Sequence, residues 1–193
     1  LLQAPAGILE DFSSLRLIHL GGSSVPKEMV KQLQQRFRCE VTCGYGLTEA
    51  SPVMTVAHPK SHLEEDEERF YYRSAMTGLE LPGSEVRVVD ENGADVCNNG
   101  KSIGEIILRS NTVMKGYWKQ PEETAEAIRD GWLYTGDLAT VDRENYLLIV
   151  DRKKDIIIRG GENIASIEIE RILYSHPAVL ECAVIAVPDS RWG

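Results

Sequence analysis

The alternation of apolar runs with glycine- and proline-rich breaks divides the 193 residues into three regions of different texture. In the first region, the apolar run Leu15–Leu20 predicts a short buried strand, and helical spacing of apolar residues predicts an amphipathic helix over residues 26–37. A second short strand is expected just before Gly44. This strand–helix–strand order predicts part of a layered α/β subdomain over residues 1–75.

The second region, residues 76–150, consists of short apolar runs separated by turn signals such as Asn92-Gly93. Strands are predicted at Glu85–Val89, Gly104–Arg109 and Tyr146–Val150. Pro121 is suited to the first turn of a short helix, which we expect over Glu122–Ile128. Short strands with few helices indicate a small antiparallel β-barrel or sheet.

The third region, residues 151–193, begins with a cluster of charged residues and returns to mixed patterns. A strand is expected at Ile156–Ile158 and a final buried strand at Glu181–Val187. Between them, the I-E-I-E stretch has a period of two, but the apolar positions fit a helix better, and we place its start near Ser166. The region predicts the start of a small α+β domain.

The composition is that of a globular protein, with 42% hydrophobic and 26% charged residues. The net charge of −9 argues against DNA or RNA as a partner, but not against a single nucleotide. No apolar run is long enough to predict a transmembrane helix, and no signal-peptide pattern is present. The four cysteines form no C-x-x-C pair, so we expect reduced thiols, no zinc site and a cytoplasmic location. P-loop, serine-hydrolase and H-E-x-x-H motifs are missing from the sequence.

The stretch Gly44–Glu49 is the first candidate for chemistry. We interpret it as a loop in which two glycines let the backbone approach a ligand and Tyr45 can stack on a flat base. A hydroxyl and a carboxylate, from Thr48 and Glu49, can hold a phosphate–magnesium pair. A glycine-rich turn around a core tyrosine explains the same residues equally well.

The second candidate is the stretch of residues 133–164. Asp137 follows a tight Thr135-Gly136 turn, and the charged cluster Asp151–Asp155 lies between two apolar strands. Charged groups at strand ends are typical of a polar site or a hinge. Two strands joined by a solvated turn are the alternative interpretation.

Five motifs in one order carry a resemblance to a known family. They are G-G-S-S-V-P at 21–26, G-Y-G-L-T-E at 44–49, G-E-I-I-L-R and M-K-G-Y-W within 104–118, G-W-L-Y-T-G-D at 131–137, and D-R-K-K-D-I-I-I-R-G-G-E-N-I at 151–164. Together they resemble the adenylate-forming superfamily of acyl-CoA synthetases, luciferases and peptide-synthetase adenylation domains. The sequence from Glu162 onward is most similar to acyl-CoA synthetases of fatty or small carboxylic acids, although many members of the family have proline where this chain has Ser166.

The resemblance implies an AMP-forming ligase of fatty acid or lipid metabolism that uses ATP, Mg²⁺ and coenzyme A. A carboxylic acid attacks the α-phosphate of ATP, and the CoA thiol then displaces AMP from the acyl-adenylate. The nucleotide-binding residues implied are Gly21, Gly22, Ser23, Gly44, Tyr45, Gly46, Thr48, Asp137 and Arg152. Of these, Tyr45 would stack on adenine, Asp137 would accept bonds from both ribose hydroxyls, and Arg152 would reach the ribose and phosphates.

The family's catalytic and CoA-binding positions fall on further residues. Thr48 and Glu49 match catalytic positions, with Glu49 as the metal ligand, and Asp151 matches the hinge about which a C-terminal domain rotates. The run Gly160-Gly161-Glu162 would flank the pantetheine arm of CoA. The family's phosphate loop and catalytic lysine do not fall on this sequence, so we expect a piece of a longer polypeptide that is inactive alone.

Two other functions stay open at this point. A ligase that loads acyl groups onto a carrier-protein thiol would have the same motifs, and a non-catalytic module would bind only a nucleotide or a partner. Intact Glu49, Asp137 and Arg152 argue against a degenerate site.

Overall fold

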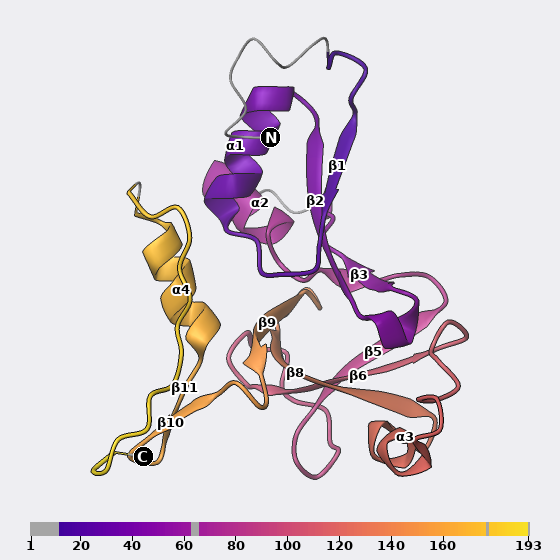
Figure 1. Ribbon diagram of the computed structural model, residues 1–193. Helices are drawn as coiled ribbons and strands as arrows, with labels where there is room; N and C mark the ends of the chain where they lie inside the picture. The colour runs from indigo at the N-terminus through magenta and orange to yellow at the C-terminus, as the bar shows by residue number, and fades with distance from the viewer. Residues whose placement is uncertain (1–11, 63–65, 177, 193) are drawn as a thin grey trace.

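The computed structural model describes residues 12–62, 66–176 and 178–192, arranged as two sheets and a small C-terminal unit (Figure 1). The first eleven residues of the α/β unit expected over 1–75 therefore lie outside the described part. The first sheet has the strand order β1 (Leu17–Leu20), β2 (Glu40–Gly46), β3 (Val53–Val56), β4 (Leu79–Glu80). Strands β1 and β2 are parallel and the other pairs are antiparallel.

Helices α1 (Lys27–Phe37) and α2 (Glu67–Ser74) lie beside this sheet (Figure 1). The predicted helix over 26–37 is confirmed, with Pro26 as its N-cap residue and Arg38 in the left-handed conformation that ends it. Val30, Leu33 and Phe37 recur on one face, are buried, and pack against β2. Burial of each such side chain contributes roughly 1.5–3 kcal/mol, so this face holds the α/β layer together.

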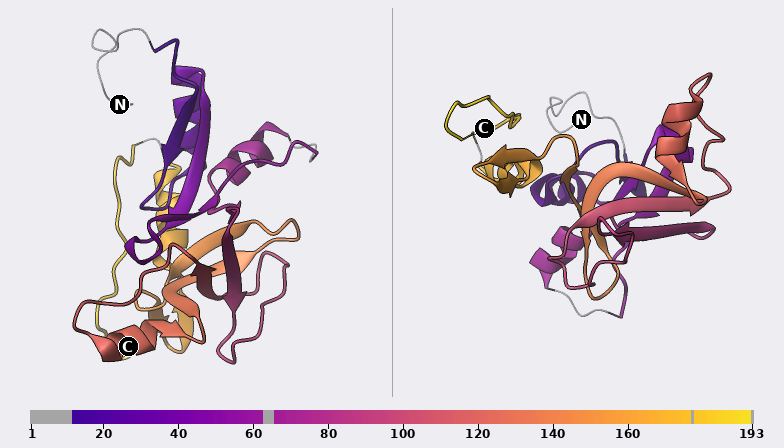
Figure 2. Two further views of the ribbon diagram at one scale, coloured as in Figure 1. Left: turned by 90° about the vertical axis from the view of Figure 1, so that its right-hand side faces the viewer. Right: turned by 90° about the horizontal axis from the view of Figure 1, so that it is seen from below.

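The second sheet is antiparallel and strongly curled, as the two views of Figure 2 show. Its strands are β5 (Ser84–Val89), β6 (Gly104–Ser110), β7 (Ile128–Arg129), β8 (Trp132–Val141) and β9 (Leu147–Arg152), and the short helix α3 (Pro121–Ala127) precedes β7. The barrel-or-sheet prediction is thus met by a half-open barrel. Its core includes Ile106, Leu108 and Leu133 and is continuous with Tyr45 and Met54 of the first sheet.

The third region contains a hairpin of β10 (Ile157–Arg159) and β11 (Glu162–Ile164), followed by α4 (Ser166–Tyr174). The helix begins at Ser166, as predicted. The strand predicted at Glu181–Val187 is wrong: this segment is extended but pairs with no strand of the described residues. Ile185 and Val187 are 76% and 72% exposed. An apolar run forms a stable strand only where the edge of another strand is available for pairing, and this segment has no such neighbour among the described residues.

Two predicted turns are also corrected by the structure. Gly44–Gly46 belong to β2 rather than to a loop, and the 3₁₀ turn η1 (Thr48–Ala50) follows one residue later. Thr135-Gly136 is not a turn either, since both residues lie within β8. There, three residues of β8 face a single residue of β6, so the strand bulges and continues instead of reversing.

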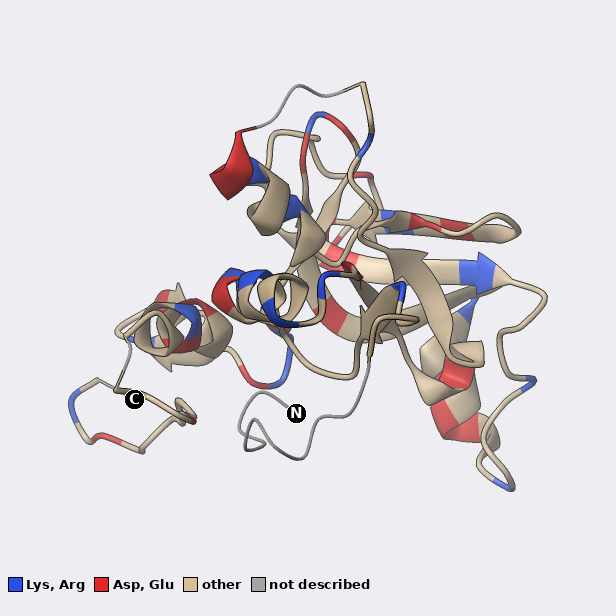
Figure 3. Cartoon of the chain, turned by 90° about the horizontal axis from the view of Figure 1, so that it is seen from above, with Lys and Arg blue, Asp and Glu red and all other residues tan. Residues whose placement is uncertain are grey.

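Acidic and basic residues are interspersed over the chain when it is seen from above (Figure 3). Several oppositely charged pairs bridge neighbouring elements, including Lys31–Glu67 between α1 and α2 and Arg73–Asp142 between α2 and the second sheet. Among the described residues, no helix combines the length and the apolar character that crossing a membrane requires.

Candidate nucleotide site

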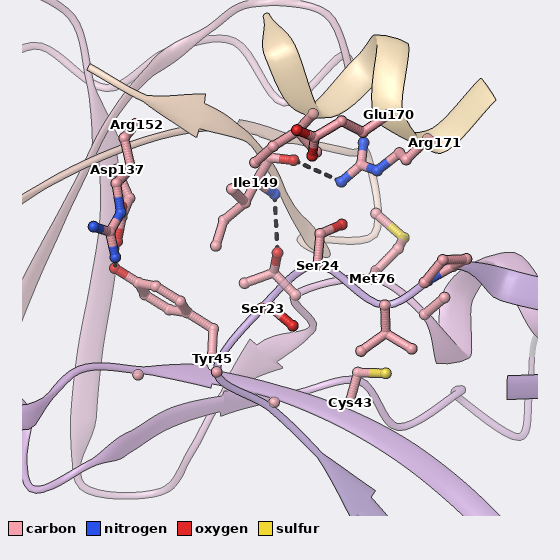
Figure 4. A pocket seen from close by; sticks show the side chains of 18 of the residues that line it. Ser23, Ser24, Cys43, Tyr45, Met76, Asp137, Ile149, Arg152, Glu170 and Arg171 are labelled. Atoms are coloured by element: carbon pink, nitrogen blue, oxygen red, sulfur yellow. Dashed lines mark hydrogen bonds and ion pairs between the residues drawn. The ribbon is translucent and has the colours of Figure 1, made fainter. Parts of the chain in front are cut away.

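A cavity of about 370 Å³ opens where the two sheets and α4 meet (Figure 4). Its walls come from the loop after β1, the end of β2, strands β8 and β9, and one face of α4. Of the residues singled out by the sequence, it brings together Gly22, Ser23, Gly44, Tyr45, Gly46, Asp137 and Arg152. Gly21 lies directly behind them, because a Cβ on Gly21 would come within 3.2 Å of the Gly44 carbonyl oxygen.

Tyr45 and Asp137 form the centre of this cavity. The Tyr45 hydroxyl donates a 2.7 Å hydrogen bond to Asp137 Oδ2, and the tyrosine is 8% exposed. Burial raises the pKa of Asp137, which the bond from Tyr45 and the nearby Arg152 guanidinium partly offset. Burial likewise raises the pKa of Tyr45, so its hydroxyl stays protonated and donates at neutral pH.

The Asp137 carboxylate is aimed by the bulge in β8. Gly136 adopts a φ of +74°, which suits glycine, and its N–H donates to Glu105 Oε1 at 3.0 Å. The Thr135 hydroxyl donates to the Ile106 carbonyl at 2.8 Å and accepts from the Asp137 N–H at 3.1 Å. A regular strand would alternate its side chains, whereas this fixed bulge turns Asp137 toward Tyr45.

Gly46 determines where η1, with Thr48 and Glu49, can lie. A Cβ on Gly46 would come within 1.5 Å of the Pro52 carbonyl oxygen, so only glycine allows this close approach of the chain to itself. Thr48 is exposed on the turn, and Glu49 is half-buried. Glu49 lines the second cavity described below, whereas Thr48 lines neither of the two cavities.

A second, more open cavity of about 490 Å³ adjoins the first and shares Asp137 and Arg152 with it. Glu49, Lys153 and Lys154 also line it, so two carboxylates, Asp137 and Glu49, share this cavity with three cations. Arg152 Nε lies 3.5 Å from Asp137 Oδ1, and the Arg152 side chain is 62% exposed. Lys153 also ion-pairs with Glu105 at 3.2 Å. From the sequence, Lys153 and Lys154 are interpreted only as surface or domain-contact residues. The excess of cations over carboxylates in this cavity suits phosphate groups.

Asp151, the expected hinge residue, lies inside β9 and is 2% exposed. Its Oδ2 accepts from the Ser166 N–H at 2.5 Å and from the Ser166 hydroxyl at 2.8 Å, and its Oδ1 accepts from the Arg152 N–H at 2.8 Å. A rotation of α4 away from β9 would break the two bonds to Ser166. Asp151 therefore fastens the C-terminal unit in the orientation seen here.

Gly160, Gly161 and Glu162 do not join the cavity. They form the turn of the β10–β11 hairpin and the start of β11, far from the two sheets in Figure 1. Gly160 instead contacts the C-terminal segment, where its N–H donates to the Trp192 carbonyl at 2.9 Å.

The site fits a magnesium ion only when phosphates complete the ligand set. Among the described residues, no group of three or more His, Cys, Asp or Glu side chains could enclose a metal. Magnesium usually binds one or two carboxylates together with substrate phosphates and water, and the half-buried Glu49 at the edge of the cationic cavity meets that requirement.

The structure also places residues in the site that sequence reasoning missed. Arg171 of α4 lines the first cavity and donates to the Ile149 carbonyl at 2.8 Å, while Ile149 N–H donates to Thr77 Oγ1 at 2.9 Å (Figure 4). Burial lowers the pKa of Arg171. Tyr117 donates to Glu49 Oε1 at 2.9 Å. The M-K-G-Y-W motif pointed to the neighbourhood of Tyr117, whereas nothing in the sequence marked Arg171.

Comparison with known proteins supports one family throughout. The sequence profile described as "AMP-binding enzyme" matches residues 1–118, and that of the "AMP-binding enzyme C-terminal domain" matches residues 168–193. A feruloyl-CoA synthase of an Amycolatopsis species is 44% identical over 95% of this chain and 35% of its own length. A long-chain-fatty-acid–CoA ligase of Thermus thermophilus is 42% identical over 93% of this chain and 33% of its own length. The chain thus spans about a third of these curated relatives.

Solved structures agree with the sequence relatives. An anthranilate CoA ligase in complex with anthranoyl-AMP superposes with a TM-score of 0.80 and 31% identity, over 94% of this chain and 33% of that one. An amide bond synthetase from Marinactinospora thermotolerans gives a TM-score of 0.84 and 33% identity, over 98% and 36% of the two chains. With both profiles, the relatives and the fold in agreement, the chain belongs to the AMP-binding enzyme family.

Proposed function

We propose that the protein containing this chain is an AMP-forming acyl-CoA synthetase. The observation that carries the proposal is the convergence of Tyr45, Asp137 and Arg152 on one cavity from three different strands. A buried aromatic ring beside a carboxylate and a guanidinium suits the base, ribose and phosphate of a nucleotide.

In the first step, the carboxylate oxygen of the acid attacks the α-phosphorus of ATP, and pyrophosphate leaves with the electrons of the broken P–O bond. Thr48 donates to the α-phosphate, and Asp137 accepts from the ribose hydroxyls. Mg²⁺ bound at Glu49 would offset the charge that builds up on the phosphates. Each charge-assisted bond from Asp137 contributes about 1.5–3 kcal/mol to nucleotide binding.

In the second step, the CoA thiolate attacks the acyl carbonyl and AMP leaves with the former carboxylate oxygen. Gly160, Gly161 and Glu162 lie away from the cavity, so this step requires the C-terminal unit to rotate. Lys153–Asp155 form the turn between β9 and β10. The Lys153 N–H still donates to the Gly136 carbonyl of β8 at 2.8 Å, so Lys154 and Asp155 are the residues of this turn that follow the last backbone bond to β8. Rotation there would release Ser166 from Asp151 and bring the hairpin toward the nucleotide.

The proposal is tested by ATP–pyrophosphate exchange in the full-length protein, screened over short, medium, long-chain and aromatic acids with and without CoA. Exchange with one class of acid and CoA-dependent release of AMP support the synthetase. Asp137→Ala should abolish exchange, while Asp95→Ala, on an exposed hairpin, serves as the matched control. No exchange with any acid would overturn the enzymatic proposal in favour of a binding module.

The acceptor of the acyl group is the least constrained part of the proposal. Since one structural neighbour is an amide bond synthetase, an amine acceptor is a specific alternative to CoA. Exchange without CoA turnover would direct the search to amines and to carrier-protein thiols. The same assay therefore separates CoA from the other two kinds of acceptor.

A further inference from the structure

Glu49 is held by a segment that lies far from it in the sequence. Tyr117 Oη donates to Glu49 Oε1 at 2.9 Å, and the Met114 N–H donates to the Glu49 carbonyl at 2.7 Å. The side chain and the main chain of Glu49 are thus both tied to the loop between β6 and α3. These two bonds restrict the Glu49 side chain to one rotamer.

Tyr117 is itself anchored by the first turn of α3. Its N–H donates to Thr124 Oγ1 at 2.9 Å, and the Thr124 hydroxyl donates to the Gln120 carbonyl at 2.6 Å. A side chain at Gly116 would come within 2.6 Å of Thr124 Cγ2, so glycine lets the loop lie against the helix. The main chain of Tyr117 is therefore held against α3, although the residue as a whole is 37% exposed.

The hydroxyl of Tyr117 is a donor and not a metal ligand. A phenolic hydroxyl can both donate and accept, and here it donates to Glu49 Oε1 at 2.9 Å. It occupies one oxygen of Glu49 and leaves the other available to a cation.

We propose that Tyr117 is a positioning residue that presents Glu49 to the divalent cation of the ATP complex. The inference rests on the proposed function, because it assumes that Glu49 meets the metal of bound ATP. Ligating carboxylates are commonly oriented by such hydrogen bonds, and their loss weakens metal binding by about 10–100-fold.

The test uses Mn²⁺ as a spectroscopic substitute for Mg²⁺ in the full-length protein. Electron paramagnetic resonance of free Mn²⁺ reports the metal affinity of the enzyme–ATP complex without requiring turnover. Tyr117→Phe should weaken Mn²⁺ binding about tenfold or more, while the affinity for metal-free ATP in EDTA stays unchanged. Tyr72→Phe is the matched control, since Tyr72 is 49% exposed and lies on α2, away from Glu49.

A double-mutant cycle with Glu49→Gln separates positioning from a general structural role. If Tyr117 acts through Glu49, adding Tyr117→Phe to Glu49→Gln should change Mn²⁺ affinity no further. Additive effects, or a Tyr117→Phe protein with normal Mn²⁺ affinity, would overturn the inference while leaving the proposed function intact. A Glu49→Gln protein with normal Mn²⁺ affinity would instead remove the metal role of Glu49 on which the inference rests.

Thr124→Val provides a second route if Tyr117→Phe lowers the melting temperature. This variant removes the anchor of the Tyr117 N–H and keeps both the phenol and Glu49. It should shift Mn²⁺ affinity in the same direction by a smaller factor, and an unchanged affinity would count against the proposal.

Discussion

The Asp151 carboxylate and the first residue of α4, Ser166, are joined by two hydrogen bonds of 2.5 and 2.8 Å. Asp151 is 2% exposed, so neither bond can be replaced by water without movement of the helix. The pair therefore couples the end of the half-barrel to the position of the C-terminal unit. A second contact, from Arg171 to the Ile149 carbonyl, holds the same helix one turn later.

Ser166→Pro should release α4 from β9. Proline is tolerated in the first turn of a helix but supplies neither the N–H nor the hydroxyl that Asp151 accepts. Because the buried Asp151 carboxylate would lose two hydrogen bonds, Ser166→Pro should lower the free energy of unfolding by on the order of 2–3 kcal/mol. Ser166→Ala keeps the N–H and should lower it by about 1 kcal/mol. Hydrogen exchange of the α4 amides in the full-length protein measures the release. Equal protection in both variants and the wild type would contradict the coupling.

Gly46→Ala should disrupt the turn that holds Thr48 and Glu49. The added Cβ would overlap the Pro52 carbonyl, which is backbone and cannot swing aside, so we expect destabilisation of about 3 kcal/mol or more. Urea denaturation gives the size of the loss. Gly93→Asn is the control, because Gly93 has open space around it and asparagine tolerates its φ of +80°. Similar losses in both variants would point to a general intolerance of glycine replacement.

Tyr45→Phe should lower the stability of the protein more than its affinity for the nucleotide. The substitution removes the hydrogen bond to Asp137 and keeps the ring, so the free energy of unfolding should fall by about 1.5–3 kcal/mol. Calorimetric titration with ATP should show a much smaller loss of affinity than in Tyr45→Ala, which removes the ring as well. Equal losses in the two variants would mean that the hydroxyl, rather than the ring, binds the nucleotide.

Asp137→Asn should stabilise the protein at neutral pH and weaken ATP binding at least about tenfold, since one charge-assisted bond is lost. Because burial raises the folded-state pKa of Asp137 above its unfolded value, the wild type loses stability as the pH rises through that interval. The variant lacks this titration. Its gain in melting temperature over the wild type should be small near pH 4 and grow toward pH 7. If the difference in melting temperature between the variant and the wild type stayed constant from about pH 4 to about pH 7, the titration of Asp137 would not be the cause of the pH dependence.

The layering of the fold was predictable because it depends on local periodicity. The helix over 26–37 and the start of α4 at Ser166 follow from the spacing of apolar residues, and the structure confirms both. The motifs likewise placed Tyr45, Asp137 and Arg152 in one site, which the cavity brings together.

Other features depend on contacts between distant segments, which periodicity does not encode. The bulge at Thr135–Asp137 looks like a turn in the sequence, because glycine marks both, and only the partner strand β6 distinguishes them. The link between Tyr117 and Glu49 spans 68 positions. Nothing in the sequence distinguishes Arg171 from a charged residue on any helix surface, and only the position of α4 beside the cavity brings it into the site.

The extended segment over 181–187 has a consequence for handling this chain in the laboratory. The side chains of Ile185 and Val187 face solvent, and the backbone of the segment pairs with no strand among the described residues. Only the Cys182 and Val184 N–H groups donate to side chains of α4, namely Tyr174 Oη and Glu170 Oε1. Such an edge is a template for intermolecular β-pairing. Expressed as an isolated polypeptide, the chain should self-associate through this segment. The substitution Ile185→Lys should keep it monomeric.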